Sequence, residues 1–243
     1  MKAFVNWSGG KDSSFCLYKA AQSGITIEKI VTTINTAKDR ISMHGVRRAL
    51  LDRQAASLNI SLTTIELPEN PDMVVYENGL SGMHQALRHQ GFTHAVYGDI
   101  FLEDLKVYRD GVLAKDGLEG IYPLWKMDSH SLMKEFLAAG FKAIVVCVNA
   151  EFLDKSFCGR IIDQSFIDDL PVNVDVCGEN GEYHSFVFDG PIFSKPIPYT
   201  KGEIIFKEYP APKNDTSDCF TTPKSTTGFY FCDLLPTHSA LLQ

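Results

Sequence analysis

The sequence predicts an α/β protein with a parallel-sheet, Rossmann-like N-terminal domain and a smaller C-terminal α/β domain. In the first half of the chain, short runs of β-branched and aromatic residues alternate with segments of helical apolar spacing, which is the pattern of a doubly wound parallel sheet. After residue 171, short strand-like segments alternate with glycine and proline instead. Pro123 interrupts regular structure between these two parts. We therefore expect one domain over residues 1–125 and a second over residues 126–243.

Strands and helices are expected to alternate along the N-terminal domain. The strands are expected at residues 2–7, 25–34, 60–67 and 94–100, and the helices at residues 12–21, 46–58, 73–90 and 103–115. Pro68 ends the third strand, and Gly91 and Gly117 end the last two helices. Residues 35–42 are polar and predict a loop. Because ligands bind beyond the carboxyl ends of parallel strands, the polar ends of the first and fourth strands should face one crevice.

The C-terminal domain is expected to contain short elements. Helices are expected at residues 129–139 and 165–170, and strands at residues 143–149, 173–177, 183–189, 202–208 and 228–233. Residues 211–227 are rich in proline, lysine, threonine and serine, which predicts a mobile loop. The apolar strand at residues 229–232 is a candidate for pairing between two subunits of a homodimer.

Composition narrows the class of protein. The net charge of -7 and the pI of about 5.5 argue against broad nucleic-acid binding, although Arg47, Arg48 and Arg53 remain a candidate basic patch. No apolar run approaches the roughly 18 residues that a membrane helix needs, and the chain starts with a strand rather than a signal peptide. We therefore expect a cytoplasmic protein with no membrane partner.

The cysteines and histidines show no metal-ligand spacing. No two of the six cysteines are spaced C-x-x-C, so we expect isolated small apolar residues. Five of the histidines are assigned no role: His84, His89, His94, His130 and His238.

The junction between the first strand and the first helix predicts an anion site. Ser8, Gly9, Gly10 and Lys11 form a tight turn, and Asp12 and Ser13 begin the helix. Glycines let the backbone approach an oxyanion, and the first helical N–H groups point at it. The string is neither G-x-x-x-x-G-K-[ST] nor G-x-G-x-x-G. The alternative is an ordinary strand–helix turn that contains two glycines.

A second polar cluster lies in residues 177–193. Glu179 and Glu182 flank Gly181, and Tyr183 and His184 follow directly. The glycines predict a turn that exposes both carboxylates at the start of a strand. Acid, phenol and imidazole so close together can bind a polar substrate or move protons. The alternative is a hydrophilic hairpin turn.

Together these segments resemble a known family. The string SGGKDS at residues 8–13 resembles the PP-loop, SGGxDS, of the ATP pyrophosphatases. With YGDI at residues 97–100, PLW at 123–125 and GExGEYxxxVxDGPxF at 178–193, the chain resembles the diphthine–ammonia ligase family over residues 1–194. It looks like the short archaeal or bacterial type, without the extra C-terminal domains of eukaryotic members.

The resemblance implies a fold and a reaction. It implies an N-terminal adenine-nucleotide α-hydrolase-like (HUP) domain, a smaller C-terminal domain and a cleft between them. ATP, with Mg²⁺, would activate a carboxylate as an acyl-adenylate and release pyrophosphate. Ammonia would then displace AMP and leave an amide. The acceptor would be diphthine on elongation factor 2, or another carboxylate in a bacterium, because bacteria do not make diphthamide.

The resemblance also implies roles for nucleotide-binding residues. The pyrophosphate of ATP would be held by Ser8, Gly9, Gly10 and Ser13, with help from Lys11 at the variable position of the motif. Asp12 would direct Mg²⁺ or cap the helix. Adenosine would meet Thr32, Thr33 and the segment of Met43 and His44, where ordinary core packing is the alternative for Met43. The ribose or α-phosphate would be approached by Gly98 and Asp99. Arg109 would face either the cleft or solvent.

The far wall of the cleft is implied to carry the acceptor chemistry, at Glu179, Glu182, Tyr183 and His184. The commonest eukaryotic form has an acidic residue and a threonine where this chain has His184 and Ser185, which leaves the acceptor open. Two other functions remain possible from the sequence. A PP-loop tRNA-modifying enzyme, either a thiolase or a lysidine-type ligase, is disfavoured by the acidic charge and the absence of C-x-x-C. A nucleotide-binding sensor of the same fold would not need the polar cluster.

Overall fold

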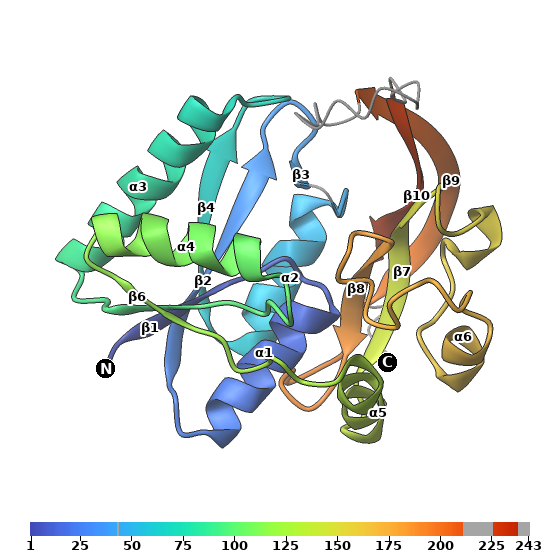
Figure 1. Cartoon of the computed structure of the whole chain (residues 1–243), viewed down its shortest axis with the longest axis horizontal. Helices are drawn as coiled ribbons and strands as arrows, with labels where there is room; N and C mark the ends of the chain where they lie inside the picture. Colours follow the sequence, from blue (N-terminus) through green and yellow to red (C-terminus); the bar gives the residue numbers. More distant parts are fainter. Residues whose placement is uncertain (43, 211–225, 238–243) are drawn as a thin grey trace, which may run out of the picture.

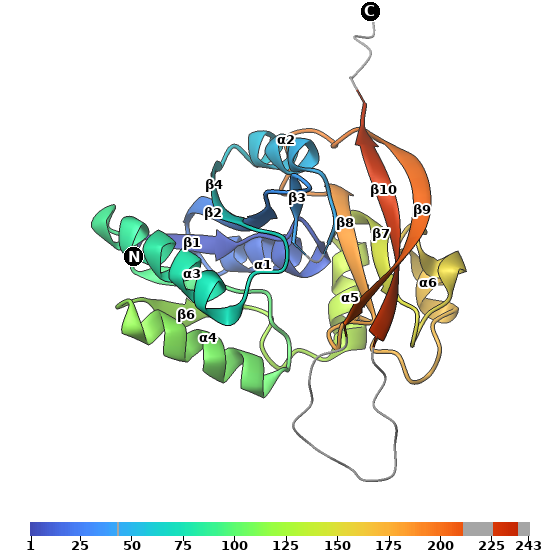
Figure 2. The ribbon, with the colours of Figure 1, turned by 90° about the horizontal axis from the view of Figure 1, so that it is seen from above.

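The structure, a computed structural model, describes residues 1–42, 44–210 and 226–237. Within these residues the chain forms two sheets that lie side by side (Figure 1, Figure 2). The first has the strand order β3-β2-β1-β5-β6, with β4 also paired to β2. Its strands are β1 (Ala3–Asn6), β2 (Ile27–Asn35), β3 (Arg40–Ile41), β4 (Ser61–Leu67), β5 (His94–Val96) and β6 (Glu119–Ile121). All pairs except β2 with β3 are parallel.

Four helices cover the two faces of this sheet, α1 (Lys11–Gln22), α2 (Arg48–Leu58), α3 (Met73–His89) and α4 (Glu103–Lys115). Alternate side chains of β1 enter different cores. Val5 packs in the core that contains residues of α1 and α2, whereas Phe4 packs in the core that contains residues of α3 and α4. The expected α/β fold is therefore confirmed, and the carboxyl end of β1 lies between the two layers of helices.

The second sheet is antiparallel and has the order β8-β7-β10-β9. Its strands are β7 (Lys142–Asn149), β8 (Tyr183–Asp189), β9 (Tyr199–Pro210) and β10 (Thr226–Pro236), and the helical segments beside it are α5 (Ser129–Ala138), η1 (Lys155–Phe157) and α6 (Gln164–Asp168). Phe15 of α1 and Phe136 of α5 belong to one continuous core that extends to Phe186 of β8. The two sheets thus share their largest core, while the boundary expected at residue 125 stays a prediction.

Several expected elements differ in the structure. Residues 35–42 contain the short strand β3, and β6 is a strand that was not expected. The fourth strand ends at Val96 instead of residue 100, because the backbone N–H of Ile100 turns to the carboxylate of Glu179. The strand expected at residues 173–177 is wrong. The Asp175 carboxylate accepts the backbone N–H groups of Cys177 and Glu179 and folds this segment into turns.

Some expectations concern residues that are only partly described. The loop expected at residues 211–227 lies outside the described residues except for Thr226 and Thr227, which begin β10. The five cysteines in the described part of the chain are free and buried. No helix among the described residues is long and apolar enough to cross a membrane.

An ion-pair cluster joins β10 to the first sheet. Arg40 Nη1 lies 2.8 Å from Asp233 Oδ1, and Arg47 Nη2 lies 2.7 Å from Asp233 Oδ2. Burial opposes ionisation of this carboxyl, but hydrogen bonds from the two guanidinium groups outweigh it and lower the pKa of Asp233 to about 2. A folded pKa below the unfolded value of about 3.9 means that the cluster stabilises the fold above that pH. The contribution is lost as the pH falls towards 2.

Asp233→Asn is therefore expected to lower the free energy of unfolding by about 1–2 kcal/mol at pH 7. Urea denaturation of both proteins at pH 7 and at pH 3 measures the effect, and the difference between them should shrink at pH 3. Glu203→Gln, at an exposed position of β9, serves as the control and should leave stability nearly unchanged. A difference that stays constant between the two pH values would contradict the assignment.

Candidate active site

The sequence predicts an anion site at the turn between β1 and α1, residues 8–13, and this turn is named the phosphate loop after that prediction. Gly9 has a φ of 75°, which favours glycine. A Cβ at Gly9 would lie 2.6 Å from the Gln54 side-chain oxygen, so the position also has no room for a side chain. Ser13 Oγ donates to the Gly10 carbonyl at 3.1 Å, and the Gly10 N–H donates to Ser8 Oγ at 3.3 Å. The two serines thereby fix the curvature of the loop.

Gln54 of α2 supports the phosphate loop from beneath. Its amide nitrogen donates to the Gly9 carbonyl at 3.0 Å and to the Val187 carbonyl of β8 at 2.7 Å. Its oxygen accepts the Trp7 indole N–H at 3.0 Å. Gln54 is fully buried, yet its place in an amphipathic helix gives no sign of this role. The sequence therefore did not reveal it.

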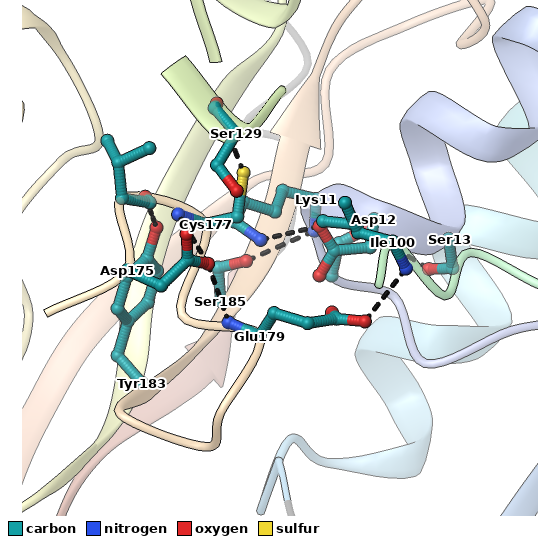
Figure 3. Close-up of polar contacts among 12 residues, drawn as sticks. Lys11, Asp12, Ser13, Ile100, Ser129, Asp175, Cys177, Glu179, Tyr183 and Ser185 are labelled. Atoms are coloured by element: carbon teal, nitrogen blue, oxygen red, sulfur yellow. Dashed lines mark hydrogen bonds and ion pairs between the residues drawn. The ribbon is translucent and has the colours of Figure 1, made fainter. Parts of the chain in front are cut away.

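Strand β8 of the second sheet also holds the phosphate loop. The Val187 N–H donates to the Gly9 carbonyl at 2.9 Å. The Lys11 backbone N–H donates to Ser185 Oγ at 3.1 Å (Figure 3). The two halves of the chain consequently meet at the loop itself, and the wall of the site comes from the second half.

Lys11 is buried beside the loop and paired with its neighbour. Lys11 Nζ lies 2.5 Å from Asp12 Oδ1, and it also lies 5.6 Å from the centre of the Tyr183 ring. Burial alone would lower the pKa of this ammonium group, but its interactions with Asp12, Tyr183 and Cys177 together outweigh burial and raise the pKa above its usual range. Lys11 therefore carries a fixed positive charge at the phosphate loop.

A cavity of about 330 Å³ opens above the phosphate loop. It is lined by most of the expected site residues, namely Ser8, Lys11, Asp12, Ser13, Thr32, Thr33, His44, Gly98, Asp99, Arg109, Glu179, Tyr183 and His184. Gly9, Gly10 and Glu182 are not among its lining residues. Met43 lies outside the described residues. The volume is within the range of small-molecule pockets.

Glu179 faces the phosphate loop from the opposite wall (Figure 3). Its Oε1 accepts the Ile100 backbone N–H at 2.8 Å, which fixes the carboxyl at the edge of the cavity. Burial is the largest cause that raises the pKa of Glu179 to about 7, and the negative charge of Asp12 adds to it. A carboxyl with this pKa can take up and release a proton near neutral pH.

The expectation that Glu182 exposes its carboxylate is wrong. Glu182 is 1% exposed. Its two oxygens accept the backbone N–H groups of Asp175 and Asn180 at 3.0 and 2.9 Å, and Oε1 also accepts the Asn180 side-chain amide. The turn that sequence alone suggested is real, but it folds Glu182 inwards. This carboxylate closes the loop that carries Glu179.

Glu182→Gln is expected to lower the free energy of unfolding by about 2 kcal/mol, because an amide nitrogen replaces one acceptor and is left facing backbone donors. Chemical denaturation measures this loss. Glu203→Gln on β9, where the side chain is exposed, is the control and should have little effect. Wild-type stability in Glu182→Gln would show that these contacts do not hold the loop.

The remaining residues of the far wall are aromatic. The hydroxyl of Tyr183 donates to the Val176 carbonyl at 2.7 Å, and the side chain is buried. The His44 and His184 rings lie 4.6 Å apart between centroids. Burial lowers the pKa of His44 to about 4 and of His184 to about 3. Two neutral imidazoles, one from each half of the chain, therefore face the cavity at pH 7.

The carboxyl end of β5 closes the site from the other side. A Cβ at Gly98 would lie 2.9 Å from the Asp12 backbone, so glycine allows β5 to pack against the start of α1. Arg109 Nε lies 2.8 Å from Asp99 Oδ2, and its guanidinium lies 4.4 Å from the centre of the Tyr97 ring. Burial raises the pKa of Asp99, and Arg109 opposes that effect. Arg109 thus faces the cavity, and the solvent-facing alternative is wrong.

The two threonines at the end of β2 differ. Thr32 is buried, and its hydroxyl donates to the Trp7 carbonyl at 2.7 Å. That contact ties β2 to the chain just before the phosphate loop. Thr33 is partly exposed and lines the same cavity.

Comparisons with known proteins agree on one family. The diphthamide synthase N-terminal domain matches residues 1–120, and the diphthamide synthase C-terminal domain matches residues 128–210. The diphthine–ammonia ligase of Danio rerio is 26% identical over 217 residues, which cover 78% of this chain and 83% of that protein. That of Bos taurus is 30% identical over 113 residues, and the match covers 44% of this chain and only 42% of the bovine protein.

A solved structure is also similar. The crystal structure of a predicted subunit of tRNA methyltransferase from Methanocaldococcus jannaschii has a TM-score of 0.40 and 15% identity, covering 60% of this chain and 80% of that chain. The family matches, in contrast, extend over both halves of the chain and include the phosphate loop and the Glu179 turn. The chain belongs to the diphthamide synthase family.

Proposed function

We propose that this protein is an ATP-dependent ligase that adenylates a substrate carboxylate and transfers ammonia to it. The observation that carries the proposal is the single cavity in which the phosphate loop faces Glu179. The diphthine–ammonia ligase names of the relatives support amide formation. A nucleotide sensor would need the phosphate loop but not a carboxyl group whose pKa is raised to about 7 on the opposite wall.

In the first half-reaction the substrate carboxylate attacks the α-phosphate of ATP, and pyrophosphate leaves. Residues 8–13, with the N-terminus of α1 and the charge of Lys11, would hold the pyrophosphate. Mg²⁺ would neutralise the phosphates, because three cavity carboxyl groups, Asp12, Asp99 and Glu179, would otherwise repel them. Asp12 would be the ligand of that ion, since its side chain lines the cavity at the loop and is 34% exposed.

In the second half-reaction ammonia attacks the acyl carbon, and AMP leaves. The nitrogen must lose a proton as the amide forms, and Glu179 is the group that can accept it. Tyr183 would have a structural role in the wall of the cavity, because its hydroxyl already donates a hydrogen bond to the Val176 carbonyl. His44 and His184 would contact the acceptor as neutral hydrogen-bonding groups.

The names of the relatives indicate diphthine as the acceptor carboxylate. We propose diphthine on elongation factor 2, which places the activity in the cytoplasm. His184 stands in this wall where the commonest eukaryotic form has an acidic residue, so the test also covers other carboxylate acceptors.

The test is to incubate the protein with ATP, Mg²⁺ and ¹⁵N-ammonium, with and without elongation factor 2 that carries diphthine. Formation of AMP and pyrophosphate, with ¹⁵N in the factor, is the expected result. Formation of ADP, or tight ATP binding without turnover on any carboxylate acceptor, would contradict the proposal. A reaction with AMP formation but another carboxylate would keep the ligase and change its acceptor.

A further inference from the structure

The second sheet has two edges, and one of them is occupied. Strand β8 forms the first edge, where the Val187 N–H donates to the Gly9 carbonyl, so the phosphate loop lies against it. Strand β9 (Tyr199–Pro210) forms the second edge, at the outer margin of the sheet in Figure 1. Among the described residues β9 pairs with β10 alone, so the other side of this strand of 12 residues has no neighbouring strand. Its backbone N–H and C=O groups there are free to pair with a second chain.

Strand β10 cannot supply such an edge. It lies between β7 and β9 and pairs with both. The pairing between subunits that the sequence suggested for residues 229–232 is therefore wrong, because both sides of this strand are already used within the chain. An association of two copies through this sheet has to use β9.

The middle of β9 exposes large apolar side chains. Ile205 is 42% exposed and Phe206 is 50% exposed, and as neighbours on a strand they point to opposite faces of the sheet. The register of β9 with β10 is regular over residues 204–210. A second strand laid along this edge would therefore cover apolar surface on both faces.

The charges on this edge are complementary to one another. Glu203 and Lys207 lie two residues before and two residues after Ile205, so the three side chains share one face. Neither charge has an ion-pair partner in the part of the chain that the structure describes. Charges of one sign would repel a second copy of this edge. Charges of opposite sign on either side of an apolar centre can instead attract it.

Lys207 is surrounded mainly by positive charge. Its Nζ lies 5.6 Å from the centre of the Phe231 ring. Burial lowers the pKa of Lys207, and the positive charges of Lys38 and Arg40 lower it further, against the attraction of Glu69. A carboxylate supplied by another chain would offset this repulsion.

Symmetry determines how two β9 strands can pair. An antiparallel pair of identical edge strands is related by a twofold axis perpendicular to the sheet, so residues opposite each other must point to the same face. The axis therefore passes beside a residue that faces its own copy. Centred on Ile205, the pairing places Glu203 opposite the partner's Lys207, twice by symmetry. Centred on Ile204 or Phe206, it would place Glu203 opposite an uncharged side chain.

We propose that two copies of this chain form a dimer through antiparallel pairing of their β9 strands, centred on Ile205. Oppositely charged cross-strand pairs stabilise antiparallel sheets, and each pair forms twice here. An unrelated strand would not need charges that mirror each other about Ile205, so a second copy is the partner that fits this edge. The two phosphate loops lie against the far edges of the joined sheet. This inference does not depend on the proposed reaction.

The first measurement is analytical ultracentrifugation of the full chain from nanomolar to millimolar concentration. A monomer–dimer equilibrium is the expected result. A chain that stays monomeric throughout this range, or that forms assemblies other than dimers, would overturn the proposal.

Charge reversal tests the register. Glu203→Lys and Lys207→Glu each turn both cross-strand pairs into like-charge pairs, and each should raise the dimer dissociation constant at least about tenfold. Glu203→Gln removes the attraction without adding repulsion, so it should raise this constant only about threefold. Lys134→Glu, at an exposed position of α5, is the matched control and should leave the constant unchanged.

Combining the two reversals separates this pairing from a general effect of charge. The double variant Glu203→Lys/Lys207→Glu should regain the wild-type dissociation constant, because opposite charges face each other again. For the same reason, an equimolar mixture of the two single variants should form a heterodimer. A dimer that is insensitive to both single changes contradicts the proposal, and so do weakened variants that neither combination restores. The mixture decides the matter where the double variant does not fold.

Discussion

Replacing Gly9 by alanine should abolish measurable ATP binding. The φ of 75° at this position costs a non-glycine residue about 1–2 kcal/mol. The new Cβ would also lie 2.6 Å from the Gln54 oxygen and push that amide away. Gln54 would then lose contacts to Trp7, Gly9 and Val187, each of which leaves buried polar groups unpaired at about 1–3 kcal/mol. Calorimetric titration with ATP and thermal unfolding measure the two consequences.

Gly24→Ala is the matched control for this change. Gly24 has a φ of 74°, almost equal to that of Gly9, but a Cβ there would meet nothing within 4 Å. It should therefore show only the backbone cost, about 1–2 kcal/mol of stability, and keep ATP binding. Equal losses in the two variants would mean that the contact with Gln54 does not position the phosphate loop.

Glu179→Gln should lower the rate of amide formation by about 10²–10⁴-fold, the usual contribution of a general base. In wild-type protein the pKa of this carboxyl is raised to about 7, so the rate should rise with pH as the carboxylate forms around that value. The charges of Asp12, Lys11 and Asp99 set this pKa together with burial. A glutamine cannot titrate, and the variant should lose that part of the pH profile.

The measurement needs a constant concentration of free ammonia at every pH, because ammonium itself deprotonates as the pH rises. ATP affinity, measured in parallel, should remain close to the wild-type value, since Glu179 lies opposite the phosphate loop. Glu119→Gln, at an exposed position of β6, is the control for removal of one negative charge. If the rise near pH 7 persisted in Glu179→Gln, another group would have to be the base.

Local patterns of apolar residues were sufficient to predict most of the helices and strands. The helix of α3 forms over nearly the expected range although Gly79 and Gly82 interrupt its pattern, because Leu80, Met83 and Leu87 share one buried face. The strands β3 and β6 escaped prediction because runs of two and three residues carry no readable periodicity. The strand expected at residues 173–177 failed for another reason. Asp175 offers the backbone a side-chain acceptor in place of a neighbouring strand.

In the candidate site, too, features set by local sequence were predictable and features set by contacts across the fold were not. The turn of the phosphate loop was predictable because glycine, serine and a helix start lie together in six consecutive residues, and its ligand stays a prediction. Gln54 was not, since its role depends on contacts across the fold that helical spacing does not encode. Glu182 was misplaced because a polar turn sequence does not show which of its two carboxylates folds inwards.

The hydrogen bonds from β8 to the phosphate loop restrict how this enzyme can be divided or recombined. Val187 and Ser185 belong to the half that carries Glu179 and the proposed acceptor site, yet they hold the Gly9 carbonyl and the Lys11 N–H. An isolated fragment of residues 1–125 would lack both contacts, and a chimera with the second half of a relative would keep its loop only if the donor strand preserved them. In the proposed reaction, acceptor preference and nucleotide affinity would both depend on β8, so exchanging the second half to change the acceptor would require the register of β8 to be kept.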